Sequence, residues 1–221
     1  MIRFKENNYN KLFVNVSDFI RLICGGDRLN RITNIIHELL KKEYLKKNKQ
    51  LKILDYGCGS MEISKKLETK NYIKSIVGSD IFNHSFKSKK LTYIKNERLF
   101  KENEKFDVIF IVDVLHHVGI SDAYKVLNKL SKLSKIIIIK DHFEHGFLSR
   151  QLLRFVDFYA NYGYGVNVPK KYFNENVWKK TLIKSNSKEV YRKNSFQQHD
   201  GLFNLILDKK HHFVSMIKIY E

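Results

Sequence analysis

The apolar positions of the chain fall into short runs that alternate with longer mixed segments. Two continuous apolar runs, over 106–112 and 135–140, are typical of strands buried on both faces of a parallel sheet. Shorter runs over 51–55, 75–79 and 91–95 predict three more strands. Strands that alternate with helical segments predict an α/β fold with a doubly wound, mostly parallel sheet.

Helical spacing of apolar residues appears before, between and after these runs. A helix is predicted over 121–133, and Ile63 to Leu67 has the spacing of another. The N-terminal segment carries two apolar stripes that predict two helices, separated at Gly25-Gly26-Asp27: Val16, Phe19, Ile20 and Ile23, then Ile32, Ile35, Ile36, Leu39 and Leu40.

The pattern changes after His142. Residues 146–164 predict a helix rich in aromatic side chains, and 174–183 predict a second helix with Asn174 as its N-cap. Two late stretches, near 189–192 and 212–220, predict a pair of strands. The 221 residues suffice for one well-buried domain, so we expect a single domain over 1–221.

The chain is strongly basic, with a formal net charge of +18 and a pI near 9.7. Such a charge raises nucleic acid as a partner, but only clustered cations form a footprint, and these lysines are spread along the chain. The two cysteines, Cys24 and Cys58, give no disulfide framework. No apolar run approaches a membrane span and no secretory signal opens the chain, so we expect a soluble cytoplasmic protein.

A glycine turn follows the first predicted strand, in the segment Asp55-Tyr-Gly57-Cys-Gly59. Strand, glycine turn and helix together form the nucleotide-binding corner of a βαβ unit. A dinucleotide fingerprint would need glycine where Glu62 stands, and a carboxylate there would repel a pyrophosphate. A cofactor without phosphate and with a cationic centre is compatible with Glu62.

Two further segments end in polar residues. The apolar run Ile76 to Asp80 ends in a carboxylate 25 positions after Asp55, at a distance suited to a ribose diol. The fourth predicted strand ends in Asp113-Val-Leu-His116-His117.

In order and spacing, these segments resemble the class I S-adenosylmethionine-dependent methyltransferases, over roughly residues 50 to 145. That family usually has a third glycine where this chain has Met61. The resemblance implies a mostly parallel seven-stranded sheet closed by an antiparallel pair, an N-terminal helical lid over 1–48 and a helical aromatic cap over 147–185. It implies S-adenosylmethionine as cofactor and S-adenosylhomocysteine as product.

The resemblance also implies the cofactor contacts. The glycine loop should hold the cofactor, Asp80 should bind the ribose, and the third-strand end should reach the adenine, through Asn96 or its neighbour Glu97. The expected cofactor-binding residues are Asp55, Gly57, Cys58, Gly59, Asp80, Ile81, Asn96 and Asp113.

Polar residues beyond the fourth and fifth strands are candidates for catalysis, because open α/β sheets bind ligands at that edge. His142 is the first candidate for a general base, followed by His117 and Asp141, since histidine titrates near neutral pH. We expect one histidine of the His116-His117 pair to be structural. Asp157 and Asn161 lie four apart on one helix face, which we expect to face His142, and with Tyr172 they are predicted to bind substrate.

The sequence thus predicts methyl transfer to an oxygen or nitrogen atom of a small molecule. An RNA methyltransferase is the alternative, favoured by charge but lacking an Asn-Pro-Pro-Tyr-like motif after the fourth strand. A protein that binds the cofactor without transfer is a third hypothesis, based on Met61. Asp141, His142 and His145 are proper metal-ligand types, but such close neighbours in sequence rarely converge on one ion, so no metal is expected.

Overall fold

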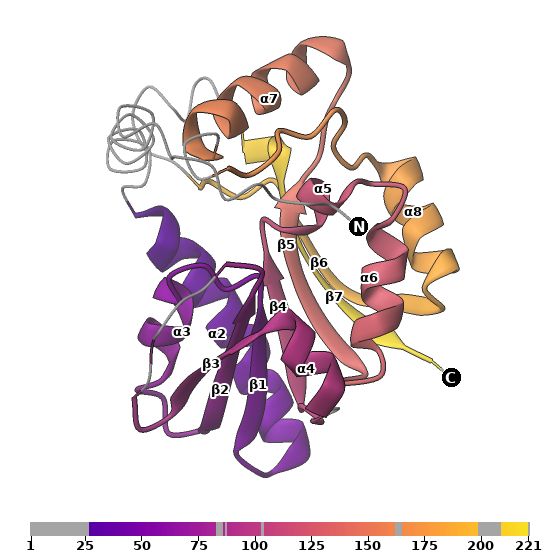
Figure 1. The fold of residues 1–221 in the computed structure, drawn as a ribbon. Coiled ribbons are helices and arrows are strands. Elements are labelled where there is room, and N and C mark those ends of the chain that lie inside the picture. The colour runs from indigo at the N-terminus through magenta and orange to yellow at the C-terminus, as the bar shows by residue number, and fades with distance from the viewer. Residues whose placement is uncertain are drawn as a thin grey trace.

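The computed structural model describes residues 27–82, 86, 88–102, 104–161, 165–198 and 209–220 (Figure 1). The strands are β1 (Leu51–Tyr56), β2 (Ile73–Asp80), β3 (Leu91–Lys95), β4 (Val108–Val112), β5 (Ile136–His142), β6 (Ser187–Asn194) and β7 (His212–Ile219). The helices are α2 (Arg28–Lys47), α3 (Glu62–Leu67), α4 (Asn96–Glu102), α5 (Leu115–Val118), α6 (Ala123–Leu130), α7 (Phe147–Asn161), α8 (Glu175–Lys184) and the short 3-10 helix η2 (Lys209–His211).

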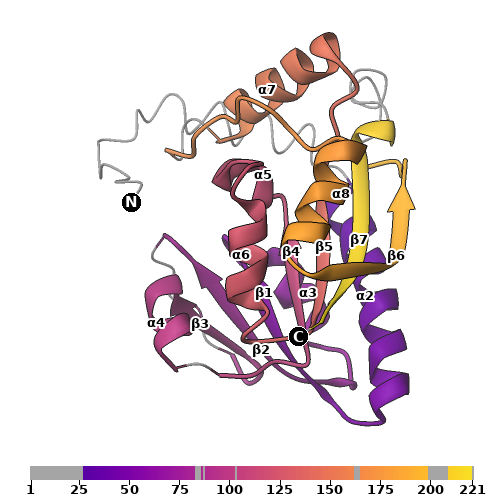
Figure 2. The ribbon, with the colours of Figure 1, turned by 90° about the vertical axis from the view of Figure 1, so that its right-hand side faces the viewer.

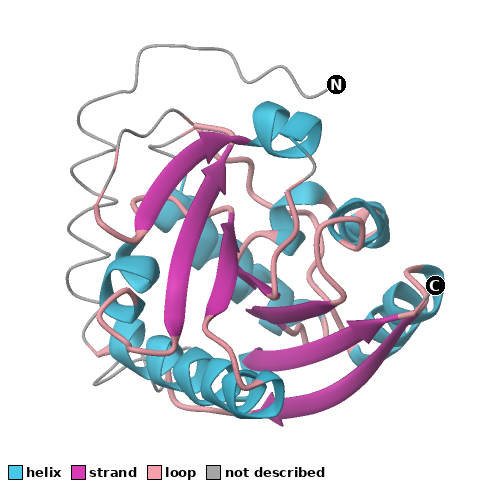
Figure 3. Cartoon of the chain, turned by 90° about the horizontal axis from the view of Figure 1, so that it is seen from below, coloured by secondary structure: helices cyan, strands magenta, loops and turns pink. Residues whose placement is uncertain are grey.

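One seven-stranded sheet has the order β3-β2-β1-β4-β5-β7-β6 (Figure 3). The pairs from β3 through β5 are parallel, while β7 is antiparallel to both β5 and β6. The predicted doubly wound sheet and its closing antiparallel pair are therefore confirmed. The parallel strands place their carboxyl ends along one edge, called here the carboxyl edge.

Helices cover both faces of the sheet (Figure 2). Alternate residues of β5 point to opposite faces, so Ile136 and Ile138 pack in one core with α2 and α3. Ile137 and Ile139 pack in a second core with α4, α6 and α8. This double burial explains why the strand is a continuous apolar run in sequence.

The helix α7 lies apart from both faces, beyond the carboxyl edge of β4 and β5 (Figures 1 and 2). The chain returns from it alongside the end of β5, where Phe143 forms an isolated bridge with Phe173. In contrast, α8 contacts α6 and β6 on the sheet. The range predicted as a cap, 147–185, thus contains one helix at the edge and one helix on a face.

The N-terminal range 1–48 is described only from residue 27 onward, so the first predicted helix lies outside the described residues. The second predicted helix is α2, and its apolar stripe is buried against the sheet. Only its first residues reach the carboxyl edge, where Arg28 contacts Asp113.

Several element ends lie one to three residues from the predicted ones. β5 runs to His142, beyond the apolar run over 135–140, because β7 pairs with it as far as His142 opposite His212. Asp141 and His142 are therefore strand residues with fixed, opposite directions. The short helix α4 between β3 and β4 was not predicted, and it begins at Asn96.

Candidate active site at the carboxyl edge

The glycine loop joins β1 to α3 at the carboxyl edge. Gly57 and Gly59 have φ values of 75° and 50°, in the region that favours glycine. A Cβ atom on Gly57 would lie 2.3 Å from Cγ2 of Val114, so only glycine fits there. The amide of Gly57 donates to the Ser79 carbonyl at 2.7 Å, which joins the loop to β2.

Met61 occupies the position where the resembling family usually has a third glycine. Its φ of 60° is also in the left-handed region, so the backbone has the conformation that a glycine would adopt there. The side chain is 1% exposed and packs against Gly78 of β2. The departure from the family pattern is thus accommodated by an absent side chain on the neighbouring strand.

Asp80 ends β2 and faces the glycine loop. One carboxylate oxygen accepts a hydrogen bond from the Gly59 amide at 2.8 Å, and the other accepts from the Phe82 amide at 3.1 Å. Asn96 lies beside it, with its side-chain oxygen accepting from Ser79 Oγ at 2.6 Å. Ile81 follows with an exposed side chain. Asn96 is thus tied to β2, while Glu97 is exposed on α4.

Asp55 is buried at the end of β1 and accepts a 2.6 Å hydrogen bond from Ser64 Oγ. Burial raises the pKa of Asp55 to about 7, and the Ser64 bond offsets this only in part. The carboxylate of Asp80 adds to the rise. A positive charge close by would therefore stabilise the ionised form of Asp55.

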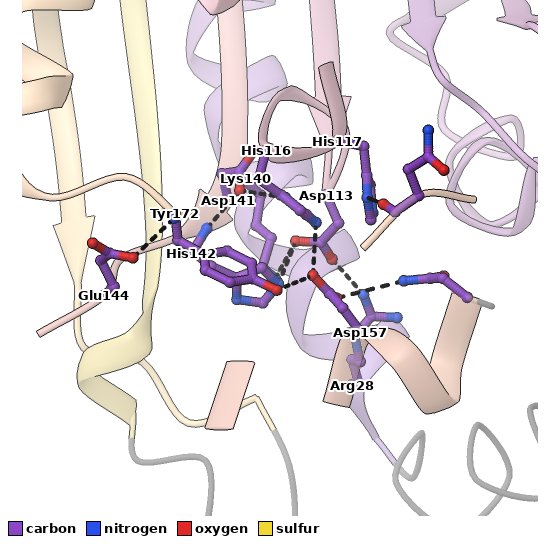
Figure 4. A network of polar contacts seen from close by, with 12 residues as sticks. Arg28, Asp113, His116, His117, Lys140, Asp141, His142, Glu144, Asp157 and Tyr172 are labelled. Atoms are coloured by element: carbon purple, nitrogen blue, oxygen red, sulfur yellow. Dashed lines mark hydrogen bonds and ion pairs between the residues drawn. The ribbon is translucent and has the colours of Figure 1, made fainter. Parts of the chain in front are cut away.

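Asp113, just after β4, is the centre of a first group of charges, called here the Asp113 network (Figure 4). Its carboxylate contacts Arg28, Lys140 Nζ at 2.6 Å and His142 Nε2 at 3.1 Å. Burial alone would raise the pKa of Asp113, but Lys140, His142 and Arg28 outweigh it and hold that pKa well below its usual value. Asp113 therefore stays ionised and compensates the buried Lys140.

His116 on α5 is the centre of a second group, the His116 network (Figure 4). Its Nδ1 lies 2.6 Å from Asp141 Oδ1, and its Nε2 lies 3.4 Å from Asp157 Oδ2 on α7. Burial would lower the pKa of His116, but Asp141 and Asp157 outweigh it and raise that pKa to about 9. Asp157 also accepts from Tyr172 Oη at 2.5 Å and from Asn161 Nδ2 at 3.4 Å.

The alternation of side chains along β5 separates the two networks. Lys140 and His142 point to the face of α2 and bind Asp113, whereas Asp141 points to the other face and binds His116. The two networks still touch, because the rings of His116 and His142 lie with centroids 5.3 Å apart.

The predicted catalytic residues occupy three different environments. Burial lowers the pKa of His142, and Lys140 lowers it further, while Asp113 partly offsets both. Burial, then His116, lowers the pKa of His117 to about 4, and its Nδ1 lies 3.0 Å from the Asn167 carbonyl. Asp141 is fully buried between His116 and the amide of His142.

The predicted substrate residues Asp157, Asn161 and Tyr172 come together at the carboxyl edge. They meet His116 instead of His142, the histidine that we expected Asp157 and Asn161 to face. The ion pairs of Arg28 and Lys140 with Asp113 were not predicted from the sequence. One histidine of the pair His116 and His117 was expected to be structural. A lysine within an otherwise apolar buried strand was the available signal for Lys140.

The alternative metal set does not converge. Asp141 is bonded to His116, and His145 Nε2 lies 2.9 Å from the Lys210 carbonyl. Among the described residues, the one group of His, Cys, Asp or Glu side chains with converging ligand atoms is His116, His117 and Asp157. In the same part of the chain, no helix has the length and apolarity needed to cross a bilayer.

A hollow of about 500 Å³ lies at the opposite edge of the sheet, where the parallel strands begin. Its lining includes Lys49, Lys52, Lys74, Lys105 and Asp107. It is therefore separated by the length of the strands from the glycine loop and from both networks.

Comparison with models of protein families shows to which family the chain belongs. The sequence model of the family described as "Methyltransferase domain" matches residues 26–205. A comparison with curated protein sequences found no match.

Solved structures share the fold at low identity. The CurJ carbon methyltransferase is 13% identical with a TM-score of 0.63, over 98% of this chain and 62% of that one. A candidate sarcosine dimethylglycine methyltransferase from Galdieria sulphuraria is 15% identical with a TM-score of 0.57, over 82% and 83% of the two chains. LepI in complex with SAM is 12% identical with a TM-score of 0.56, over 82% of this chain and 46% of that one.

Proposed function

The chain belongs to the methyltransferase-domain family and is an S-adenosylmethionine-dependent methyltransferase, and we propose that it methylates an oxygen or nitrogen atom of a small molecule. The observation that carries this proposal is the buried set of polar side chains at the carboxyl edge, between β5 and α7. A few convergent polar groups in apolar surroundings are how small-molecule sites are usually built.

The proposed cofactor site is the glycine loop with Asp80 and Asn96. Gly57 and Gly59 leave the backbone open to close approach, and Asp80 is the proposed acceptor for the ribose hydroxyls. In the transfer, the acceptor atom attacks the methyl carbon while the carbon–sulfur bond breaks. The electron pair of that bond remains on sulfur, which gives S-adenosylhomocysteine. An acceptor hydroxyl or ammonium must also lose a proton.

His142 is the proposed base for that proton. Its Nε2 lies 3.1 Å from the Asp113 carboxylate, so this nitrogen carries the hydrogen and Nδ1 keeps its lone pair. His142 Nδ1 is buried and has no hydrogen-bond partner. Buried polar atoms are usually paired, and the hydrogen of an acceptor hydroxyl or amine would satisfy this one.

Asp141 takes another role in the proposal, and the catalytic part of His117 stays a prediction. Asp141 positions His116 in this proposal, because its Oδ1 lies 2.6 Å from His116 Nδ1 and accepts from the His142 amide at 2.7 Å. Tyr172, Asp157 and Asn161 are the proposed wall of the acceptor site on the side of His116, where they set its shape and polarity.

The test is a comparison of His142→Ala with wild type. Release of S-adenosylhomocysteine is measured on a panel of hydroxyl and amine metabolites, and calorimetry gives cofactor affinity. We expect turnover to fall by about 10²–10⁴-fold, the contribution of a general base, with cofactor affinity nearly unchanged. The exposed His145→Ala is the matched control and should keep wild-type turnover.

Asp80→Ala provides the contrast within the same experiment. It should weaken cofactor binding, because Asp80 supports Gly59 as well as the proposed ribose contact. Wild-type turnover in His142→Ala would overturn the role of His142. Failure of every small acceptor, with transfer to RNA instead, would overturn the substrate class.

A further inference from the structure

Three side chains of the His116 network have the arrangement of a metal site. His116 and His117 on α5 and Asp157 on α7 each offer one ligand atom, and these atoms lie within 4.8 Å of one another. We propose that His116, His117 and Asp157 bind a divalent transition-metal ion. The three residues come from two elements far apart in sequence, which the fold brings together at the carboxyl edge (Figure 4).

Each of the two histidines is held by its other ring nitrogen. His116 Nδ1 is bonded to Asp141 at 2.6 Å, and His117 Nδ1 to the Asn167 carbonyl at 3.0 Å. Both partners are acceptors, so each Nδ1 carries a hydrogen, and each Nε2 offers its lone pair in the neutral ring; at His116 the ion has to displace a proton. Metal-binding histidines almost always have such a partner, which fixes the ring and increases the basicity of the ligand atom.

Asp157 is oriented in the same way. Tyr172 Oη donates to one carboxylate oxygen at 2.5 Å and Asn161 Nδ2 lies 3.4 Å from the other. Ligating carboxylates are themselves commonly hydrogen-bonded by outer partners. The two residues that hold Asp157, Tyr172 and Asn161, therefore serve the site without binding the ion.

A second observation points to a ligand independently of this spacing. His116 is 1% exposed, and its Nε2 has no hydrogen-bond partner. The nearest carboxylate oxygen, on Asp157, is 3.4 Å away, too far for a good bond. An ion between the two groups would satisfy both, whereas a proton on His116 is the competing occupant.

The ligand chemistry selects the ion. Two imidazole nitrogens and one carboxylate suit Zn²⁺, Co²⁺ or Mn²⁺ better than Mg²⁺ or Ca²⁺, which prefer all-oxygen sites. Three protein ligands also leave a coordination position open. A hydroxyl acceptor bound there would lose its proton more readily; this role rests on the proposed function, but the binding of the ion does not.

The experiment uses untagged protein that has been treated with a chelator and then freed of it. Calorimetry with Zn²⁺, Co²⁺ and Mn²⁺ chlorides should give one site per chain for at least one ion, and Co²⁺ should develop visible absorption. His117→Gln and Asp157→Asn should each weaken binding at least tenfold. Asp141→Asn should weaken it by about 10–100-fold, as expected for an outer partner.

The matched control is His145→Gln, since His145 is exposed and bonded to the Lys210 carbonyl. It should bind the ion like wild type. Circular dichroism and thermal melting show whether His117→Gln, whose side chain is less buried than that of His116, remains folded. Absence of stoichiometric binding, or binding that survives in His117→Gln and Asp157→Asn, would overturn the site. Loss of the ion without loss of methyl transfer would support the site and overturn its role in the reaction.

Discussion

Asp113 compensates the charge of a lysine that has no exposed surface. Lys140 is 0% exposed and its Nζ lies 2.6 Å from Asp113. Asp113 itself has a φ of 55°, a conformation that only a few residue types, Asp and Asn among them, adopt readily. One residue therefore meets a backbone requirement and an electrostatic requirement at the same position.

Asp113→Asn separates the two requirements, because asparagine tolerates the backbone but lacks the charge. We expect a loss of about 3–5 kcal/mol in the free energy of unfolding, since the Lys140 cation stays buried without a counterion. Urea denaturation measures this loss. The double variant Asp113→Asn with Lys140→Met should recover most of it.

The control for that series is a surface pair. Asp122 lies 2.7 Å from Lys125 with both side chains about half exposed, so Asp122→Asn should change stability by less than about 1 kcal/mol. A similar loss in both aspartate variants would show that burial of Lys140 is not the cause.

Asp55 should make the cofactor-free protein less stable as the pH rises. Its pKa is about 7 in the folded chain against 3.8 as the ordinary value, so the folded state holds a proton that the unfolded state has released. Stability is therefore lost between about pH 4 and pH 7 and then levels off. Asp55→Asn removes this loss and should be more stable than wild type at pH 8.

The size of the Asp55 effect has an upper limit of about 4 kcal/mol, at about 1.4 kcal/mol for each pKa unit. Thermal or urea denaturation of both proteins between pH 4 and pH 8 measures it. A constant difference across this range would contradict the raised pKa of Asp55.

At the scale of elements, the glycine loop and β2 share an apolar contact besides their hydrogen bonds. Met61 fills the space beside Gly78, where a Cβ atom would lie 2.6 Å from Met61 Cε and 2.9 Å from Cys58 Sγ. Gly78→Ala should therefore cost about 1–3 kcal/mol through overpacking, and Met61→Ala about 2–5 kcal/mol through a cavity.

The double variant Met61→Ala with Gly78→Ala should be more stable than the sum of these losses predicts. The new methyl group occupies part of the space that the thioether leaves, so we expect a coupling energy of about 0.5–3 kcal/mol. Urea denaturation of the four proteins measures it. Gly78→Ala combined with Leu127→Ala should instead be additive, because Leu127 of α6 packs in the second core, on the other face of the sheet. Equal coupling in both pairs would contradict the contact.

The elements themselves followed from the sequence because their signals are local. The apolar run over 135–140 predicted β5, and Asn174 was a correct N-cap, with its side chain accepting from the Val177 amide at 3.0 Å. The antiparallel pair at the C-terminus was also predicted, and β6 with β7 confirms it.

The arrangement of the polar groups could not be predicted from the sequence, because it depends on contacts between residues far apart in the chain. The shared helix face of Asp157 and Asn161 could be predicted from their spacing, but the histidine that α7 meets could not. The bridge between Phe143 and Phe173 and the bond from the Tyr172 amide to Glu144 at 3.0 Å set the path of the returning chain. Such contacts have no signature within a short window of sequence.

At the scale of the molecule, the two edges of the sheet differ in charge and in chemistry. The carboxyl edge carries the glycine loop and both networks, where cations and carboxylates are paired. The opposite edge carries the hollow with Lys49, Lys52, Lys74 and Lys105, of which Lys49 pairs with Asp107 and Lys52 with Glu104. A six-residue strand such as β1 spans about 20 Å, so these two regions are separated by roughly that distance.

This separation bears on the RNA alternative that the net charge of +18 raises. The nucleotides seated in the basic hollow would not lie at the glycine loop. We therefore expect RNA binding that is weak, driven by charge and unrelated to methyl transfer. If the four lysines contact phosphates, the logarithm of the affinity should fall with the logarithm of salt concentration with a slope of about −3.

A variant with Lys49→Glu and Lys105→Glu tests this expectation against wild type. Binding of a fluorescent single-stranded RNA is titrated at salt concentrations between about 50 and 200 mM. Release of S-adenosylhomocysteine is followed on the panel of hydroxyl and amine metabolites. The variant should lose RNA affinity and flatten the salt dependence, while turnover stays at the wild-type value because neither lysine lies at the carboxyl edge. His142→Ala should show the reverse, with RNA affinity intact and turnover lost. RNA binding that resists salt and weakens in His142→Ala would place the nucleic acid at the carboxyl edge, and RNA would then replace the small molecule as the acceptor.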